Sequence, residues 1–371
     1  MRLGVKAALV GGELVDGDVD IQDGVITRLG VAPSGADGVA VPGFIDLHIN
    51  GVAGVDFLAA DPEGYRRAGE VLARTGVVAY QPSFVSSDPG AYAEPLRAAR
   101  EAVADSESSG LPLVLGVHLE GPFLSPEWPG AHDPEHLRLP DLVLAQSLLE
   151  GGRVTMMTLA PELPGALELI DRLVARDVVV SCGHSDAEAE HAHAAYDRGA
   201  RAITHVHNAH RRWRPRDPGI GGAALVRPEV TVQAIVDGVH LAPESAFGAF
   251  LAAGRRFCLV TDAIEAAMLD AGDYELGGRA VRLRDGAVRL PDGTLAGSVL
   301  TMDEAVRNLV ASGADWTGAV YAASTAPARL LGRDDLGRLG PGMPAHVTVL
   351  DDELRVLRTF VSGREALSAS A

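Results

Sequence analysis

The stretch VPGFIDLHI, at residues 41–49, is an apolar run of strand length with a histidine near its end. Seven more such runs follow, and stretches with helical spacing of apolar residues separate most of them. They are VVAYQPSF at 77–84, LPLVLGVHLEG at 111–121, RVTMMTLAPE at 153–162, VVVSCGHSD at 178–186, RAITHVHNAH at 201–210, VTVQAIVDGVHL at 230–241 and FCLVTDAI at 257–264. Strands buried on both faces give near-continuous apolar runs, and eight units alternating with helices are typical of a (β/α)8 barrel. The sequence therefore predicts an α/β fold with a TIM-like barrel.

The two ends of the chain have a different pattern. Residues 1–40 and 343–364 both alternate apolar residues with turn residues. We expect the two ends to form one small antiparallel β-sandwich domain, from residues 1–42 and 336–371, beside a barrel of residues 43–335. The segment 279–298 contains two Asp-Gly pairs, which predict a further hairpin.

Composition excludes several classes of function. The net charge of −18 argues against a nucleic-acid partner, which requires a basic stripe. No apolar run reaches the length of a membrane span, and the N-terminus lacks the pattern of a signal peptide, so a cytoplasmic protein without membrane association is expected. Lys6 is the only lysine and lies outside the eight runs, so no carboxylated lysine can bridge two metal ions. Cys182 and Cys258 lie in apolar runs and are expected to be buried free thiols.

Polar side chains occupy the ends of these runs. In (β/α)8 barrels the C-terminal ends of the strands converge on one mouth, where catalytic groups lie. The residues at such positions are His48, Gln81, Glu120, His184, His205, His240 and Asp262. One of them alone would be interpreted as a turn or capping residue, but seven in register indicate an active site.

Three of these residues suit a metal ion. Glu120, His184 and His205 offer a carboxylate and two imidazoles, which is the ligand set of a catalytic divalent ion with room left for water. Water bound to such an ion becomes a nucleophile near neutral pH. Asp262 is expected to take the proton and later to deliver it to a leaving nitrogen. In a strand His207 would point to the same side as His205, so it either contacts the metal or substrate or packs at the barrel mouth.

A series of motifs adds a family resemblance. PGFIDLHING, HLEGPFLSPEWPGAH, GHSDA, DGVHL, LVTDA and LAGSVLTM occur in this order between residues 42 and 303, with TH, NA and RDPG between GHSDA and DGVHL. Through them the chain resembles the N-acetylglucosamine-6-phosphate deacetylases of the amidohydrolase superfamily. The resemblance implies metal-dependent hydrolysis of the acetamide of N-acetylglucosamine 6-phosphate to glucosamine 6-phosphate and acetate.

The resemblance also implies roles for single positions. The metal ligands and the catalytic carboxylate correspond to Glu120, His184, His205 and Asp262. Groups that contact the substrate correspond to His132, His240, Asn208 and Ala209. His132 is expected to polarise the acetyl carbonyl together with the metal. Arg216 matches an arginine that reaches the phosphate in the neighbouring subunit, which implies a homodimer.

The chain departs from the family pattern in three places. Members with two metals carry His-x-His at the end of the first strand, whereas this chain has His48, Ile49 and Asn50, which favours one ion. THVHNAH places His207 and His210 where an aromatic residue and a methionine are typical. RRWRPRDPG at 211–219 is a basic segment that either changes the phosphate pocket or lies on a solvated loop.

Several alternatives remain open. Zinc is the first expectation for the metal, and iron or manganese also accept this ligand set. The substrate could be the galactosamine or mannosamine epimer. A superfamily deaminase or cyclic amidase acting on a ring, and a barrel that binds a sugar phosphate without catalysis, are the other interpretations.

Overall fold

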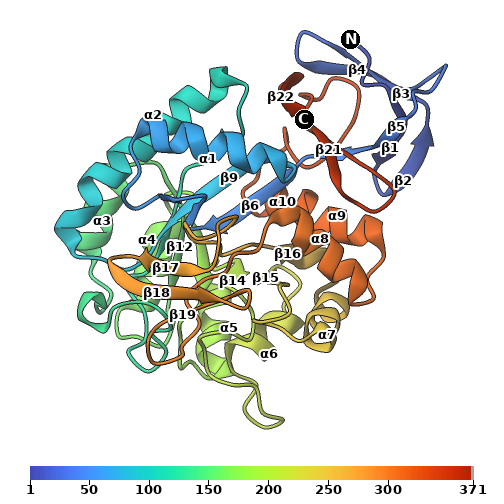
Figure 1. The fold of residues 1–371 in the computed structure, drawn as a ribbon. Coiled ribbons are helices and arrows are strands. Elements are labelled where there is room, and N and C mark those ends of the chain that lie inside the picture. Colours follow the sequence, from blue (N-terminus) through green and yellow to red (C-terminus); the bar gives the residue numbers. More distant parts are fainter. Residues whose placement is uncertain (369–371) are drawn as a thin grey trace.

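The computed structural model describes residues 1–368 and contains a closed barrel with a smaller β-domain beside it (Figure 1). The eight barrel strands are β6 (Phe44–Ile49), β9 (Val77–Phe84), β11 (Val117–Glu120), β12 (Val154–Leu159), β13 (Val179–Cys182), β14 (Ala202–Ile203), β15 (Thr231–Ala234) and β16 (Phe257–Leu259). They pair in parallel in chain order, and a short strand, β10 (Leu113–Val114), also pairs with β9. Each strand lies inside its predicted run, so the prediction of a (β/α)8 barrel is confirmed.

The barrel closes just beyond its regular strands. The backbone N–H of Asp262 donates to the carbonyl of His48 at 2.8 Å, and that of Asn50 donates to the carbonyl of Ala263 at 2.7 Å. Ile49 and Ala263 form a parallel bridge at the same level. Two of the polar positions predicted at the mouth therefore lie on the closing seam, where the backbone fixes their spacing.

Helices cover the outside of the barrel (Figure 1). Between strands lie α1 (Pro62–Arg74), α2 (Ala93–Ser109), α3 (Leu142–Gly151), α4 (Ala166–Val174), α5 (Ala189–Asp197), α6 (Gly219–Val226) and α7 (Pro243–Ala253), and after β16 come α8 (Met302–Ala311), α9 (Trp316–Ala323) and α10 (Thr325–Leu330). Helix α1 shows why they form: Asp61 caps it by accepting from the N–H of Gly64, Pro62 opens it, and one face buries Tyr65 and Leu72. Within residues 1–368, no helix combines the length and apolarity that crossing a bilayer requires.

Both chain ends build the small β-domain. Its main sheet has the order β2-β1-β5-β20-β21-β22. The bounds are β1 (Val5–Val10), β2 (Glu13–Asp16), β5 (Asp37–Pro42), β20 (Val347–Leu350), β21 (Val356–Val361) and β22 (Arg364–Ser368), with a separate hairpin of β3 (Asp18–Gln22) and β4 (Val25–Val31). Val5, Ile26, Val347 and Phe360 share its core. A domain built from both termini is confirmed, but the expectation of only antiparallel pairing is wrong because β1 and β5 are parallel. Residues 369–371 of the predicted segment lie outside the described residues.

A three-stranded sheet follows the last barrel strand. It consists of β17 (Gly272–Leu276), β18 (Arg279–Arg284) and β19 (Ala287–Arg289), all antiparallel. The turn at Asp285–Gly286 joins β18 to β19 as the sequence predicts, and β17 is an additional strand that the sequence reasoning missed. The sheet lies across the front of the barrel in Figure 1 and packs its own apolar cluster against Val85 and Ile264.

Candidate active site

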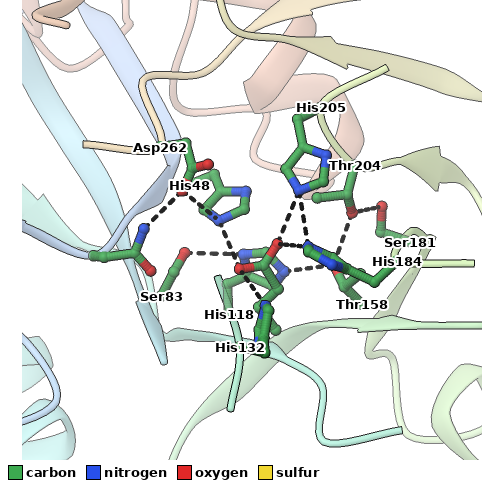
Figure 2. Close-up of polar contacts among 12 residues, drawn as sticks. His48, Ser83, His118, His132, Thr158, Ser181, His184, Thr204, His205 and Asp262 are labelled. Carbon is green, nitrogen blue, oxygen red and sulfur yellow. Dashed lines mark hydrogen bonds and ion pairs between the residues drawn. The ribbon is translucent and has the colours of Figure 1, made fainter. Parts of the chain in front are cut away.

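Glu120, His184 and His205 lie close together at the barrel mouth. Figure 2 labels the two histidines, whose rings point toward one another. Oε1 of Glu120 lies 3.1 Å from Nε2 of each histidine, and the two Nε2 atoms are 3.1 Å apart. All three side chains are buried, although they lie at or just beyond the ends of three different strands. The structure thus brings the three predicted ligands into one cluster.

The backbone turns sharply at most of these positions. Glu120 ends β11, whereas His184 and His205 each lie two residues beyond a strand with φ of 48° and 29°. Asp262 has φ of 50°. A non-glycine residue in this region costs about 1–3 kcal/mol, and such strain is concentrated at functional sites. The turned backbone directs these side chains into the mouth rather than along the strands.

The donor chemistry of this cluster suits a divalent cation. Nδ1 of His184 lies 3.0 Å from the carbonyl of Trp128, and since a carbonyl only accepts, Nδ1 carries the proton. The lone pair of Nε2 then faces the carboxylate of Glu120 and the ring of His205, a repulsive arrangement that a cation relieves. Tetrahedral nitrogen and oxygen ligands of zinc are about 3.3 Å apart, close to the observed spacing. The three residues therefore fit a metal ion.

Asp262 lies beside this cluster. Its Oδ1 accepts from the amide Nδ2 of Asn50 at 2.7 Å and lies 3.2 Å from Nε2 of His48, which in turn is 3.4 Å from Oε2 of Glu120. His48, Glu120 and Asp262 form a second close group of donor atoms. Burial opposes a charge on His48, but the carboxylates of Glu120 and Asp262 outweigh it and raise the pKa of His48 to about 9.

His132 faces the same carboxylate from the opposite side. Its Nε2 lies 3.3 Å from Oε2 of Glu120, and its Nδ1 accepts from the backbone N–H of Ser86 at 3.1 Å. Because Nδ1 accepts, the neutral ring carries its proton on Nε2, which points into the site. The segment is held by Arg279 of β18, whose Nη1 donates to the carbonyls of Ala131 and His132 at 3.0 Å each.

Sequence reasoning missed this role of Arg279, because only the packing of the three-stranded sheet over the barrel brings it to His132. It also missed His118, which is buried beneath the cluster. His118 contacts Oγ of Ser83 at 2.9 Å and Oγ1 of Thr158 at 2.7 Å, and burial holds its pKa well below the usual range. The signal was available, since His118 is two residues before Glu120 and shares its face of the strand.

A buried aspartate supports the position of Asp262. Asp46 accepts from Oγ1 of Thr261 at 2.5 Å and from the backbone N–H of His48 at 3.2 Å. Burial raises the pKa of Asp46 to about 6, against these hydrogen bonds. Thr261 precedes Asp262, and His48 bonds to Asp262 where the barrel closes. Asp46 therefore links the first and last barrel strands from inside the barrel.

A cavity of about 530 Å³ opens above the cluster, and we call it the catalytic cavity. Its walls include the predicted substrate-contacting residues His132, His240, Asn208 and Ala209, together with Asp262 and Asn50. His240 is held by Asp237, whose Oδ2 lies 2.7 Å from Nδ1 of the ring. Four acidic residues line the catalytic cavity, Glu120, Glu127, Asp262 and Asp292, against two arginines, Arg212 and Arg279.

Three candidates lie elsewhere. Gln81 is buried inside the barrel and donates to Oγ1 of Thr155 at 2.5 Å. Arg216 is exposed and does not line the catalytic cavity of its own chain. His207 is exposed, its ring lies 6.2 Å from that of Trp213, and it belongs to neither donor group. The expectation that His205 and His207 share a strand is wrong, because β14 ends at Ile203.

Comparison with known proteins places the chain in a family. The amidohydrolase family model matches residues 39–366. N-acetylgalactosamine-6-phosphate deacetylase of Escherichia coli O157:H7 is 36% identical over 96% of both chains. N-acetylglucosamine-6-phosphate deacetylase of Bacillus subtilis is 35% identical over 89% of this chain and 85% of its own, and the human enzyme of that name is 38% identical over 90% and 84%.

Solved structures agree with the sequence relatives. N-acetylglucosamine-6-phosphate deacetylase of Thermotoga maritima superposes with a TM-score of 0.92 at 35% identity over the whole of both chains. The D267A mutant of the Mycobacterium smegmatis enzyme, in complex with N-acetyl-D-glucosamine-6-phosphate, has a TM-score of 0.93 at 34% identity over 99% of both chains. The chain therefore belongs to the amidohydrolase family, and within it to the N-acetylated amino-sugar phosphate deacetylases.

Proposed function

We propose that this chain hydrolyses N-acetylglucosamine 6-phosphate to glucosamine 6-phosphate and acetate. The observation that carries the proposal is the buried group of Glu120, His184 and His205, with Asp262 beside it, at the base of the catalytic cavity. The names of the relatives and the sugar phosphate bound to the Mycobacterium smegmatis structure support this choice of substrate.

The residues divide the reaction between them. Glu120, His184 and His205 would hold a divalent cation, which would supply Lewis acidity toward the acetyl carbonyl and the attacking water. Asp262 accepts a proton from that water as the oxygen adds to the carbonyl carbon, and it donates the proton to nitrogen as the C–N bond breaks. Nε2–H of His132 is placed to donate to the carbonyl oxygen, where negative charge develops. The products are a free amine and acetate.

We infer one ion per chain, with zinc preferred over iron or manganese. The second donor group has a single imidazole, from His48, and Asn50 donates its amide to Asp262. Lys6, the only lysine, pairs with Asp352 in the small domain, far in sequence from the mouth. Elemental analysis of protein saturated with one metal should approach one ion per chain, and His205→Ala should lower that value. A reproducible value near two contradicts the inference.

We also infer that the protein works as a homodimer in which Arg216 reaches the phosphate bound by its partner. Arg216 is exposed on the loop before α6 and lies outside the catalytic cavity of its own chain. Guanidinium binds phosphate through two parallel hydrogen bonds and keeps its charge at all physiological pH values. Arg212 lines the catalytic cavity of its own chain. The same loop would therefore supply Arg212 to the cavity of its own chain and Arg216 to the cavity of the partner.

The cytoplasm is the compartment that we propose for this reaction. Cys182 and Cys258 are buried and unpaired, as is usual for proteins in a reducing environment. A phosphorylated sugar carries a charge that prevents it from crossing a membrane unaided, so its hydrolysis takes place where it is made.

The galactosamine epimer is the second candidate substrate. The Escherichia coli relative named for it matches 96% of this chain, more than the relatives from Bacillus subtilis and human named for glucosamine. Acetate release from the 6-phosphates of N-acetylglucosamine, N-acetylgalactosamine and N-acetylmannosamine should be measured side by side with metal-loaded protein. We expect the glucosamine compound to react fastest. Faster release from the galactosamine compound would favour the second candidate, and no release from any of them contradicts the proposed reaction.

A further inference from the structure

A second cavity, of about 390 Å³, lies where the small β-domain meets the barrel. We call it the junction cavity. The small domain contributes Leu9 of β1, the turn of Gly11 and Gly12, and Pro42 at the end of β5, and the barrel contributes α9, α10 and Arg255. The segment 333–338, which leads from α10 toward β20, completes the lining. None of these residues lines the catalytic cavity. The junction cavity is therefore a separate site.

The junction cavity is basic in an acidic protein. Four arginines line it, Arg255, Arg329, Arg333 and Arg338, against one acidic residue, Asp334. The catalytic cavity has the opposite balance, and the whole chain carries a net charge of −18. Arg255 lies in the turn Gly254–Arg256 just before β16, at the strand end opposite to the catalytic mouth. An anion that the protein surface repels in general is attracted here.

Contacts within the protein hold these arginines in place. Nη1 of Arg329 donates to the hydroxyl of Tyr321 at 2.9 Å, and the guanidinium of Arg255 lies 5.2 Å from the centre of the same ring. Arg338 donates from Nε and Nη2 to the backbone carbonyl of Asp334 at 3.1 and 2.8 Å. Such contacts reduce the conformational entropy lost when a ligand binds.

Only one of the four arginines has its charge neutralised. Arg333 forms a two-pronged pair with Asp335. Within residues 1–368, the ion pairs of the structure include Arg333 but none of Arg255, Arg329 and Arg338. The guanidinium groups of Arg255, Arg329 and Arg338 therefore keep N–H donors that a bound anion can use.

The rest of the lining limits the size and nature of a ligand. Leu9, Val320 and Leu336 supply an apolar wall, and Thr317 supplies a hydroxyl group, whereas the hydroxyl of Thr325 already donates to the carbonyl of Gly337 at 2.6 Å. The volume lies in the range of small-molecule sites, which combine apolar walls with a few convergent polar groups. A compact polar molecule with one strongly anionic end matches this lining.

We propose that the junction cavity binds a small organic phosphate monoester. A phosphate has three terminal oxygens and close to two negative charges, so it can accept from several guanidinium groups at once. A carboxylate offers two oxygens and one charge to the same arginines. The proposal concerns the end of the barrel away from the reaction, and it stands whether or not the chain hydrolyses an acetamide.

Glucose 6-phosphate, which has no acetamide, is the probe for a calorimetric titration of the full-length holoenzyme. All proteins in this comparison carry Arg216→Ala, so that the phosphate donor proposed for the catalytic cavity is absent and the signal reports the junction cavity. The test variant is Arg329→Ala with Arg338→Ala, and the matched control is Arg100→Ala, an exposed arginine of α2 far from the cavity in sequence. We expect the parent Arg216→Ala protein and the control to bind the probe equally and the double variant to bind it at least about tenfold more weakly. The thermal midpoint should rise with the probe in the first two proteins only.

Three outcomes overturn the proposal. They are the absence of saturable binding by the parent Arg216→Ala protein at millimolar probe, equal affinity in the double variant, and tighter binding of citrate than of glucose 6-phosphate. Arg329→Gln, which keeps a donor for Tyr321, provides the same comparison if the double variant does not fold. In that case a loss of affinity in Arg329→Gln supports the site, and unchanged affinity overturns it.

Discussion

The two ends of the catalytic cavity are built differently. At the end assigned to the acetyl group, Glu120, His184 and His205 are buried and lie at or just beyond the ends of barrel strands whose spacing the hydrogen-bonded sheet fixes. At the end assigned to the phosphate, the segment 211–217 is a loop whose arginines are mostly exposed. In our proposal one chain therefore completes the reaction centre, whereas recognition of the phosphate depends on a loop and on a second chain.

The largest effect is expected at the buried end. Asp262→Asn should fold and bind metal but lose at least about a thousandfold in kcat, because proton transfer contributes about 10²–10⁴ and this residue serves twice. Acetate release and metal content are the measurements. Retention of more than about a tenth of the activity excludes Asp262 from this role.

A smaller loss is expected at the loop end. Arg216→Ala should lower kcat/KM by about 30- to 150-fold, mainly through KM, since it removes roughly 2–3 kcal/mol of charged hydrogen bonding to the phosphate. The unphosphorylated sugar should be a poor substrate for both proteins and should react equally with each. A variant that distinguishes the two sugars as wild type does contradicts the assignment of Arg216.

Mixing chains tests whether Arg216 acts across subunits. Heterodimers of Asp262→Asn and Arg216→Ala chains should contain one site with both its own Asp262 and the arginine of its partner. Activity should therefore rise on mixing. If subunit exchange is demonstrated and activity stays constant, Arg216 does not act in the neighbouring site.

A loss of about tenfold in kcat is expected when the support of His132 is removed. Arg279→Ala deletes the donor to the carbonyls of Ala131 and His132, which should displace the imidazole of His132. A tenfold loss in kcat corresponds to about 1.4 kcal/mol of transition-state stabilisation. Arg282→Ala on the same strand, whose exposed side chain pairs with Asp273, is the control. Metal content and KM should stay unchanged, and Arg279→Lys should restore part of kcat. A change in KM alone argues for a direct contact with substrate instead.

The smallest effect is expected at His207. His207→Phe introduces the aromatic residue typical of the family at an exposed position outside both donor groups. Activity should change by no more than about twofold, as for other surface substitutions. Loss of bound metal in this variant would instead make His207 a ligand.

The barrel was predictable from the sequence because buried parallel strands are apolar along their whole length. The runs at 77–84 and 257–264 each contain one barrel strand. Pairing was harder to predict, since no local pattern shows that β1 pairs with β5 in parallel or that residues 272–276 join the hairpin as β17. These features depend on partners distant in the fold.

The candidate site shows the same limit. Glu120, His184, His205 and Asp262 could be predicted because polar residues at the C-terminal ends of barrel strands converge on the mouth. His207 was placed on a strand because the apolar pattern continues through Val206, but the backbone leaves the sheet after Ile203 and has positive φ at 205 and 207. The role of Arg279 could not be predicted, because Arg282 and Arg284 lie on the same strand and the sequence does not distinguish the three arginines.

The sheet of the small domain has a consequence for synthesis on the ribosome. Strand β5 pairs with β20, so that Val39–Pro42 meet Val347–Leu350 only after about 300 further residues have been translated. Strands β1, β2 and β5 emerge first and leave the edge of β5 without its final partner, and an open edge of this kind invites pairing with other chains. The barrel is complete in the nascent chain before this edge is covered. We therefore expect the pairing of β20 with β5 to be the folding step that protects a newly made chain from aggregation.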